Sequence, residues 1–154
     1  ITCMIAKNFG KLDFKKYHPS GSLGIKLRTV GDIMLVGNKI PFVKENISMD
    51  NALRIISKKS LGVLFIKKNN ITTGILTDGD IKRISQKFPD FKKIKIKSVM
   101  KKNPLSVEKD MLAAKALEIM NTNRITSLCV HKGKQTKKTI GVIHIHNILE
   151  NNIQ

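Results

Sequence analysis

Gly74-Ile75-Leu76-Thr77-Asp78-Gly79-Asp80 is the stretch that decides the fold of this chain. An apolar run that ends in a hydroxyl and two carboxylates is typical of a buried strand passing into a helix. Thr77 is expected at the strand end, where its hydroxyl can donate to a phosphate. Asp78 or Asp80 is expected at the helix start, where a carboxylate caps the helix or accepts from ribose hydroxyls and backbone amides favour an anion. Gly74 would let a ligand approach the strand backbone closely.

A purely structural interpretation of the same stretch stays open. In that interpretation Asp78 is simply a helix cap and Thr77 is an ordinary strand end, as is common in proteins without ligands. The neighbouring sequence is needed to decide between the two.

The surrounding sequence contains an internal repeat. Two amphipathic helices are predicted by apolar residues spaced i, i+3, i+4 and i+7, namely Met49, Ala52, Leu53 and Ile56, and then Ala113, Ala116, Leu117 and Met120. After each helix we expect a strand, a polar turn, a second strand that begins near a glycine, and a short helix. The strands are Leu61–Ile66, Thr73–Leu76, Ile125–Val130 and Ile140–Ile143, and the short helices start near Asp80 and Asn147. The pattern predicts an α/β (α+β) fold in which a β-α-β-β-α unit is used twice.

Two further features repeat with the same order. A similar short segment precedes each half, Gly31–Met34 in one case and Lys97–Met100 in the other, and a proline follows each. Ser48 and Asp110 are expected to cap the two long helices near their starts.

The order of these elements, the two preceding segments and Gly74–Asp80 resemble the cystathionine-β-synthase-type (CBS) repeat. Two such repeats normally pack sheet against sheet as one CBS pair, or Bateman module. The resemblance implies that Thr77 contacts the phosphate, and Asp80 the ribose, of an adenosyl ligand. The implied cleft residues are Gly74, Thr77, Asp78 and Asp80, with His144 and Asn147 at the matching places of the second repeat. Because those two replace threonine and aspartate, one occupied cleft or none is as compatible with the sequence as two.

The N-terminal part of the chain carries a second resemblance. The string from His18 to Leu27, HPSGSLGIKL, looks like the HPxGxLGxxL junction of arabinose-5-phosphate isomerases, in which a sugar isomerase (SIS) domain precedes a CBS pair. We therefore expect residues 1–28 to hold a short helix and loop from the end of an SIS domain, 29–90 the first CBS repeat and 91–154 the second. His18 matches a catalytic histidine of that family, and the alternative is a loop histidine that fixes the linker.

The resemblance implies a regulatory or oligomer-forming CBS pair. In the intact enzyme the family interconverts D-arabinose 5-phosphate and D-ribulose 5-phosphate for the lipopolysaccharide sugar Kdo. The base and phosphate loop of that reaction lie before the matched part, so we expect no isomerase activity from this chain alone. A free-standing nucleotide-sensing CBS protein and a purely structural dimerisation module are the alternatives, and the HPSGSLG string argues against the former. The expected partners are a second copy of the chain and an adenine or cytidine nucleotide.

Composition restricts the remaining possibilities. The 154 residues carry a formal charge of +18, yet lysine supplies 25 of the 29 basic residues and arginine only four. Base recognition favours the planar fork of arginine, so we expect no specific nucleic-acid binding, only weak polyanion binding at low salt. Apolar runs are too short to span a membrane. Two cysteines, Cys3 and Cys129, form no disulfide framework, which favours a reducing compartment, the cytoplasm.

The histidines near the C-terminal end of the sequence raise the question of a metal site. His144 and His146 would project from one strand face if the strand continued through both, and His131 is the only nearby candidate for a third ligand. Structural zinc normally needs four protein ligands, so we expect no metal here and no cofactor.

Overall fold

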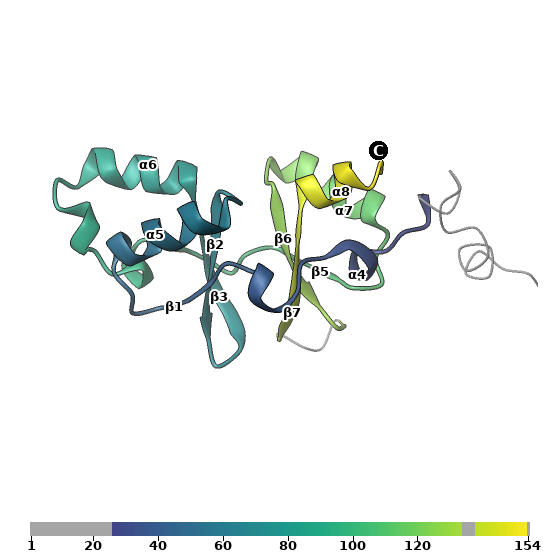
Figure 1. Ribbon diagram of the computed structural model, residues 1–154, viewed down its shortest axis with the longest axis horizontal. Helices are drawn as coiled ribbons and strands as arrows, with labels where there is room; N and C mark the ends of the chain where they lie inside the picture. Colours follow the sequence, from purple (N-terminus) through teal and green to yellow (C-terminus); the bar gives the residue numbers. More distant parts are fainter. Residues whose placement is uncertain (1–25, 134–137, 154) are drawn as a thin grey trace, which may run out of the picture.

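Two β-sheets face each other at the centre of the molecule, and helices cover their outer faces (Figure 1). The computed structural model describes residues 26–133 and 138–153 of the chain. The first sheet has the strand order β1-β2-β3-β4, and the second has the order β5-β6-β7. The layers therefore run helix, sheet, sheet, helix, which is the sheet-against-sheet packing expected for two repeats.

The β-α-β-β-α unit predicted from the sequence is confirmed in both halves. In the first half it comprises β1 (Phe42–Lys44), α5 (Met49–Lys59), β2 (Val63–Lys68), β3 (Ile71–Thr77) and α6 (Asp78–Lys87). In the second half it comprises β5 (Ser106–Glu108), α7 (Ala113–Asn123), β6 (Ser127–His131), β7 (Thr139–His144) and α8 (Ile145–Glu150). Between and before these units lie α4 (Val30–Ile33), η1 (Gly37–Lys39), η2 (Phe91–Lys93), η3 (Ile96–Ser98) and β4 (Lys101–Lys102).

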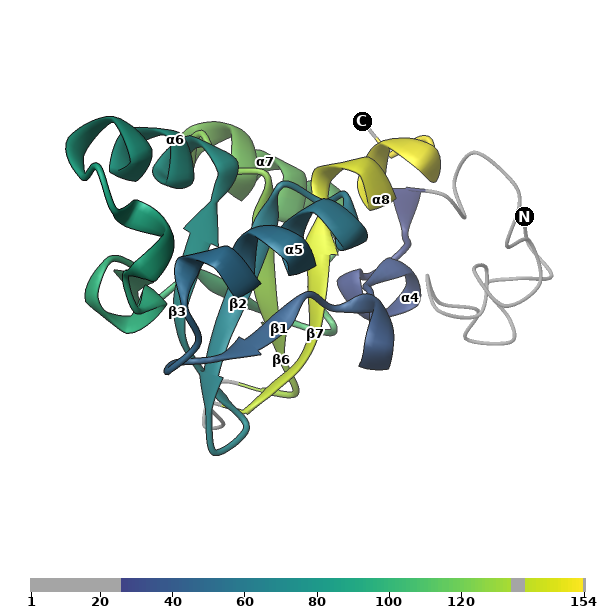
Figure 2. The same cartoon turned by 60° about the vertical axis from the view of Figure 1, so that its left-hand side comes forward.

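Strand pairing is the same in the two halves. β1 pairs with β2, and β5 with β6, in parallel, whereas β2 pairs with β3, and β6 with β7, antiparallel. Asn69 and Asn70 form the two-residue turn between β2 and β3 with φ of 50° and 63°, as a type I′ turn requires. Figure 2 shows that α6 and α8 begin at the same end of the sheets, opposite this hairpin turn.

Three apolar clusters hold the layers together. One lies between the first sheet and α5 and α6, and includes Met49, Ala52, Ile56, Leu64 and Leu76. The second lies between the second sheet and α7 and α8, and includes Ala113, Ala116, Met120, Leu128 and Ile143. The third lies between the two sheets and consists of Ile40, Val63, Phe65, Cys129 and Val142. The predicted helix stripes thus form the two outer cores, and β-strand alternation supplies the inner one.

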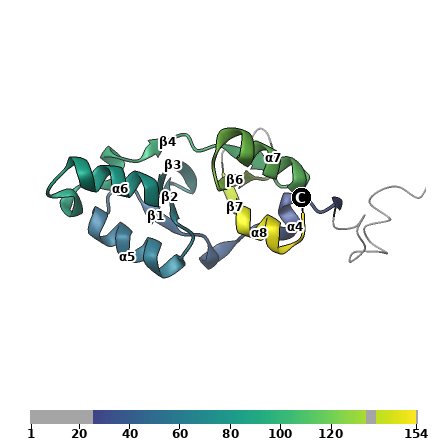
Figure 3. The same ribbon diagram turned by 90° about the horizontal axis from the view of Figure 1, so that it is seen from above.

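The segments that precede the repeats cross over to the opposite half. These leading segments, residues 30–35 and 96–102, each pack on the other unit (Figure 3). Val30 lies in the core of the second half, and the Leu35 backbone N–H donates to the Val142 carbonyl at 2.8 Å. In return, Ile96 lies in the core of the first half, and β4 extends the first sheet next to β3. Each half is therefore completed by residues from the other.

This exchange explains one glycine in each half. A Cβ built on Gly74 would collide with the Met100 side chain and lie 3.1 Å from the Lys101 carbonyl oxygen. A Cβ on Gly141 would collide in the same way with Met34. The close approach expected at Gly74 is therefore made here by the leading segment of the second half.

Of the expected helix starts, one is confirmed and three need correction. The hydroxyl of Ser48 caps α5 as expected, accepting from the Asn51 N–H at 3.5 Å. Asp110 does not cap α7, because that helix begins at Ala113 with Leu112 at the N-cap and no side-chain cap. The helices α6 and α8 begin at Asp78 and Ile145, two residues earlier than expected in each case. The reason is that residues of the expected first turn reach back to the strand end and close the helix there.

Candidate functional site

The end of β3 and the start of α6 form a reciprocal cap. Thr77 is the N-cap residue, and its hydroxyl oxygen accepts from the Asp80 backbone N–H at 3.2 Å. The Asp80 carboxylate accepts in turn from the Thr77 N–H at 3.1 Å and from the Thr77 hydroxyl at 2.6 Å. Asp78 is the first helical residue, so the alternative in which Asp78 is the cap is wrong. The two residues that the sequence predicts for ligand contact are thus held rigidly against each other.

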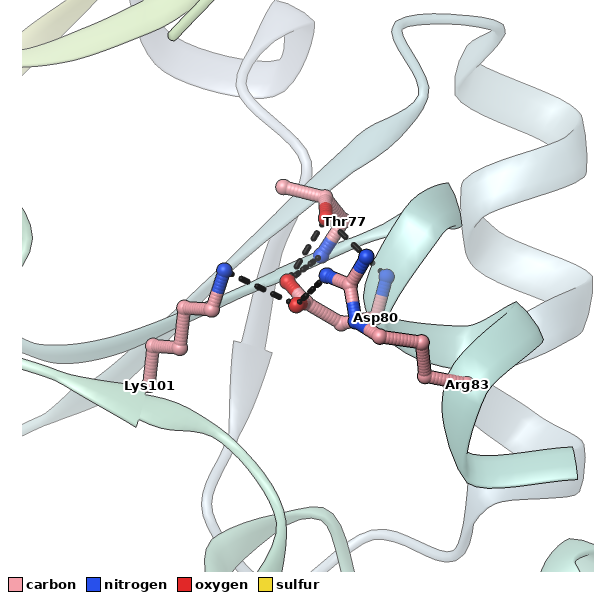
Figure 4. Close-up of polar contacts among 4 residues, drawn as sticks. All are labelled: Thr77, Asp80, Arg83 and Lys101. Atoms are coloured by element: carbon pink, nitrogen blue, oxygen red, sulfur yellow. Dashed lines mark hydrogen bonds and ion pairs between the residues drawn. The ribbon is translucent and has the colours of Figure 1, made fainter. Parts of the chain in front are cut away.

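The Asp80 carboxylate also contacts two cationic side chains (Figure 4). An Arg83 guanidinium nitrogen lies 2.5 Å, and the Lys101 ammonium 2.9 Å, from the same oxygen, Oδ1. Burial alone would raise the pKa of Asp80, but hydrogen bonds from Thr77, Lys101 and Arg83 outweigh it and lower the pKa to about 2. Asp80 is 6% exposed and stays ionised at neutral pH.

A cleft of about 480 Å³ opens beside this cap. Its walls come from both halves: Val63, Ile75, Thr77, Gly79 and Arg83, the connecting residues Lys101, Lys102, Asn103, Pro104 and Leu105, and Arg124, Ile125, Thr126 and Ser127. Clefts of this size hold drug-sized ligands, usually on apolar walls with a few polar groups. The wall composition fits a ligand with a flat apolar part and an anionic part.

One buried hydroxyl on the cleft wall lacks a partner. Ser127 is 6% exposed, and its Oγ has no hydrogen-bond partner among the described residues. A buried polar group without a partner costs roughly 1–3 kcal/mol. A ligand that supplies such a partner would recover that cost.

The matching cap of the second half uses different side chains. His144 is the N-cap residue of α8, and its Nδ1 accepts from the His146 backbone N–H at 3.2 Å. Asn147 Oδ1 accepts from the His144 N–H at 3.2 Å, as Asp80 does from Thr77. Burial, together with the nearby His146 ring, lowers the pKa of His144, although the Leu61 carbonyl opposes the shift.

The condition for a shared strand face of His144 and His146 is not met. β7 ends at His144, so His146 lies in α8 and the two rings approach with centroids 4.8 Å apart. Within residues 26–133 and 138–153 no group of three or more His, Cys, Asp or Glu side chains could hold a metal ion.

The structure brings together only some of the residues that the sequence predicts for the site. The structure brings Thr77, Asp78 and Asp80 to one helix start, while Gly74 lies three residues up the strand under Met100. His18 lies outside the described residues. The cationic wall residues and Ser127 were not predicted, because only Arg83 carries a local signal, its i+3 spacing from Asp80.

A second cavity, of about 490 Å³, lies toward the hairpin end of the sheets. Two of the polar side chains at its wall are already hydrogen-bonded: Thr73 donates to Glu45 at 2.9 Å, and the Thr72 hydroxyl lies 2.7 Å from that of Thr139. Burial raises the pKa of the Cys129 thiol at its wall to about 12, so this thiol is not a nucleophile at neutral pH. The cleft beside Thr77 and Asp80 is the better candidate site.

Comparison with protein families and relatives supports the fold. The CBS domain family matches residues 30–87 and 96–153. An arabinose 5-phosphate isomerase, KdsD, of Francisella tularensis subsp. tularensis is 38% identical over 151 residues, which are 97% of this chain and 46% of that protein. The KdsD of Escherichia coli strain K12 is 36% identical, with 97% and 45% covered. The chain thus spans about half the length of these relatives.

Solved structures with the same fold contain CBS domains. The crystal structure of CBSX2 in complex with AMP has a TM-score of 0.71 and 22% identity, covering 82% of this chain and 97% of that one. The CBS domain pair of protein MJ0100, in complex with 5′-methylthioadenosine and S-adenosyl-L-methionine, has a TM-score of 0.68 and 22% identity, covering 80% and 94%. In the part of the chain that the structure describes, no helix has the length and apolarity to cross a membrane.

Proposed function

The chain belongs to the CBS-domain family, and from that premise we propose that it is the regulatory, nucleotide-binding CBS pair of an arabinose-5-phosphate isomerase. The assignment to an isomerase rests on 36–38% identity to KdsD proteins across 97% of the chain. The whole protein would interconvert D-arabinose 5-phosphate and D-ribulose 5-phosphate for lipopolysaccharide synthesis. In that protein residues 1–28 would end the SIS domain, 29–90 and 91–154 would be the two CBS repeats, and His18 would act in acid–base catalysis.

The observation that carries the nucleotide proposal is the Thr77–Asp80 cap at the mouth of the cleft. Asp80 is ionised, and its Oδ1, which among the described residues contacts only the exposed cations Arg83 and Lys101, suits the hydroxyls of a ribose. Thr77, Arg83 and Lys101 lie within reach of a phosphate attached to that ribose. Apolar Ile75, Leu105 and Ile125 line the remaining wall, where a base would pack. CBSX2 with AMP is a relative in fold whose ligand has these three parts.

The cap of the second half is the weaker candidate for ligand binding. His144 and Asn147 repeat the capping geometry, but Asn147 has no charge and His144 accepts through a ring nitrogen instead of offering a hydroxyl. We therefore propose Gly74, Thr77, Asp78 and Asp80 as the primary ligand region, with His144 and Asn147 as a poorer copy. The proposal also includes assembly of the pair into a homo-oligomer. It includes a cytoplasmic location as well, which the buried free thiol of Cys129 supports.

Calorimetric titration tests the nucleotide proposal. AMP, ATP and CMP are titrated into the wild type and into the Thr77→Ala and Asp80→Asn variants at physiological salt, because non-specific anion binding to a +18 chain fades there. We expect an adenine nucleotide to bind and both substitutions to weaken it by about tenfold or more.

Asp50→Asn is the matched control, since Asp50 also lies in the first turn of a helix and pairs with an arginine, but far from the cleft. It should leave the affinity unchanged. Binding that disappears with salt, or that survives both cleft substitutions unaltered, would exclude this function. A preference for CMP would change the nucleotide but keep the site.

The isomerase part of the proposal is tested in the whole protein. His18→Ala should lower turnover by about two orders of magnitude, the usual scale for a lost acid–base group. A change of less than a few-fold with the fold intact would make His18 a linker residue.

A further inference from the structure

We propose, on the basis of the nucleotide site above, that the first-half cleft selects nucleoside polyphosphates over monophosphates and binds one per chain. The site proposed above needs one ribose and one phosphate. The distribution of charge around the cleft provides for more than one phosphate.

The side chains around this cleft carry more positive charge than the neighbouring carboxylates neutralise. Four cationic side chains line it, namely Arg83, Lys101, Lys102 and Arg124, and none of the lining residues is acidic. The Asp80 carboxylate at its edge contacts Arg83 and Lys101, both through Oδ1. Asp80 and its neighbour Asp78, the first residue of α6, carry two negative charges against these four positive ones. A ligand with several negative charges would complete the balance.

The cations come from three separate elements, so they surround the cleft instead of forming one stripe. Arg83 belongs to α6, Lys101 and Lys102 form β4, and Arg124 is the C-cap residue of α7 with φ of 52°. Arg83 and Lys101 converge on Asp80 from opposite sides (Figure 4). A chain of two or three phosphates that begins near Thr77 can contact successive cations, whereas one phosphate can contact only those nearest the cap.

Binding would also redistribute the partners of Asp80. The side chains of Arg83 and Lys101 are 66% and 63% exposed, so both can turn toward a phosphate at small cost. Asp80 keeps the hydrogen bond that it accepts from the Thr77 backbone N–H, while the Thr77 hydroxyl can turn to donate to a phosphate. The oxygen that the cations leave can accept from ribose hydroxyls. The carboxylate thus holds the two cations near the cleft until an anion takes them.

The second half has none of these cations at the matching positions. Glu150 stands six residues after His144, as Arg83 stands six after Thr77. Leu35 and Val36 follow Met34, where Lys101 and Lys102 follow Met100. Ser60 is the C-cap of α5 with φ of 53°, where Arg124 caps α7. These four positions thus supply one acid, two apolar side chains and one hydroxyl in place of four cations, which predicts a stoichiometry of one ligand per chain.

The test is calorimetric titration of the chain with adenosine, AMP, ADP, ATP and inorganic triphosphate at one fixed physiological ionic strength. We expect ATP to bind at least about tenfold more tightly than AMP, with ADP between them and one site per chain. Arg124→Gln and Lys102→Gln should reduce the ratio of ATP to AMP affinity to about threefold or less while AMP still binds, because neither residue contacts Asp80.

Lys115→Gln is the control for overall charge, since Lys115 is an exposed lysine on the outer helix α7. It should leave the ratio unchanged. Equal affinities for AMP and ATP, with both lost in Asp80→Asn, would overturn this inference and leave the nucleotide site intact. Triphosphate that binds as tightly as ATP, with adenosine and AMP not bound, would keep the polyphosphate preference and overturn the nucleotide function. A ratio that persists in Arg124→Gln and Lys102→Gln but falls in Lys115→Gln would overturn the assignment to the cleft.

Discussion

The two helix starts at the same end of the molecule have the same backbone and different chemistry. In the first half a threonine and an aspartate cap α6, and in the second half a histidine and an asparagine cap α8. Both pairs satisfy the helix-start N–H groups, so the fold tolerates either. The two caps differ in charge, because Asp80 forms ion pairs with Arg83 and Lys101 whereas Asn147 is neutral and forms none among the described residues. Both repeats thus need the capping geometry, whereas the charge of the capping side chains can differ between the halves.

The leading segments show the opposite behaviour, since there the two halves remain alike. Met100 covers Gly74 and Met34 covers Gly141, with a carbonyl oxygen of the same segment about as close to each glycine. The two halves therefore share the glycine–methionine contact and differ in the charge at their helix caps. Substitutions can test both statements.

The largest expected loss of stability comes from disturbing the glycine–methionine contact that both halves share. Gly74→Ala and Gly141→Ala should each lower the free energy of unfolding by about 2–3 kcal/mol, because the added methyl group meets a methionine side chain and a backbone carbonyl. Urea denaturation measures both. Gly133→Ala is the control, since no atom of the described residues lies within 4 Å of its Cβ position, and it should be close to neutral. A neutral Gly74→Ala beside a costly Gly141→Ala would show that the exchange is not equivalent.

The cap of the first half comes next in size. Thr77→Ala should cost about 1–2 kcal/mol of unfolding free energy, because the Asp80 N–H loses its acceptor and the carboxylate loses a donor. Thr77→Ser keeps both bonds and should stay within about 0.5 kcal/mol of the wild type. If the two variants were equally stable, the hydroxyl would have no part in the cap.

Acid unfolding should reveal the charge difference between the halves. The pKa of Asp80 is lowered from 3.8 to about 2, so the carboxylate adds stability above pH 3.8 that is lost as the pH falls toward 2. We expect the loss to be about 1 kcal/mol, because solvent screens its exposed partners. Denaturation of wild type and Asp80→Asn from pH 5 to pH 2 measures it, and the two curves should converge at the acid end. Parallel curves would contradict the lowered pKa.

The smallest expected effect concerns the second cap and occurs at a different pH. Burial lowers the pKa of His144 below 6.5, so the folded state binds this proton less readily than the unfolded state. Stability should therefore be complete above pH 6.5 and decrease as the pH falls below it. His144→Asn, which retains a capping side chain, should lose less stability than the wild type between pH 7.5 and pH 5.5. An identical pH profile in the variant would show that other groups cause the loss.

Much of the fold could be predicted from local sequence, and the cleft only in part. The 3.6-residue spacing around Ala52 and Ala116 gave both long helices their correct faces. The helix starts were misplaced by two residues, because Asp80 and Asn147 act backward on the strand end instead of beginning the helix. Arg124 and Lys101 could not be assigned, since only the packing of the two halves brings them to Thr77. The crossing of the leading segments has no local signal either, apart from the two glycines.

That crossing also sets an order in which the molecule can close during synthesis. The segment that ends at Leu35 leaves the ribosome well before its partner, Val142, which lies roughly a hundred residues later in the chain. β4, by contrast, follows β3 along the chain and can pair with it as soon as it emerges. The first sheet can thus finish while translation continues, whereas α4 and Leu35 have to wait for β7. The second half is then completed only when β7 pairs with Leu35, and a nascent chain stopped before residue 142 would expose Val30 and Met34 to chaperones.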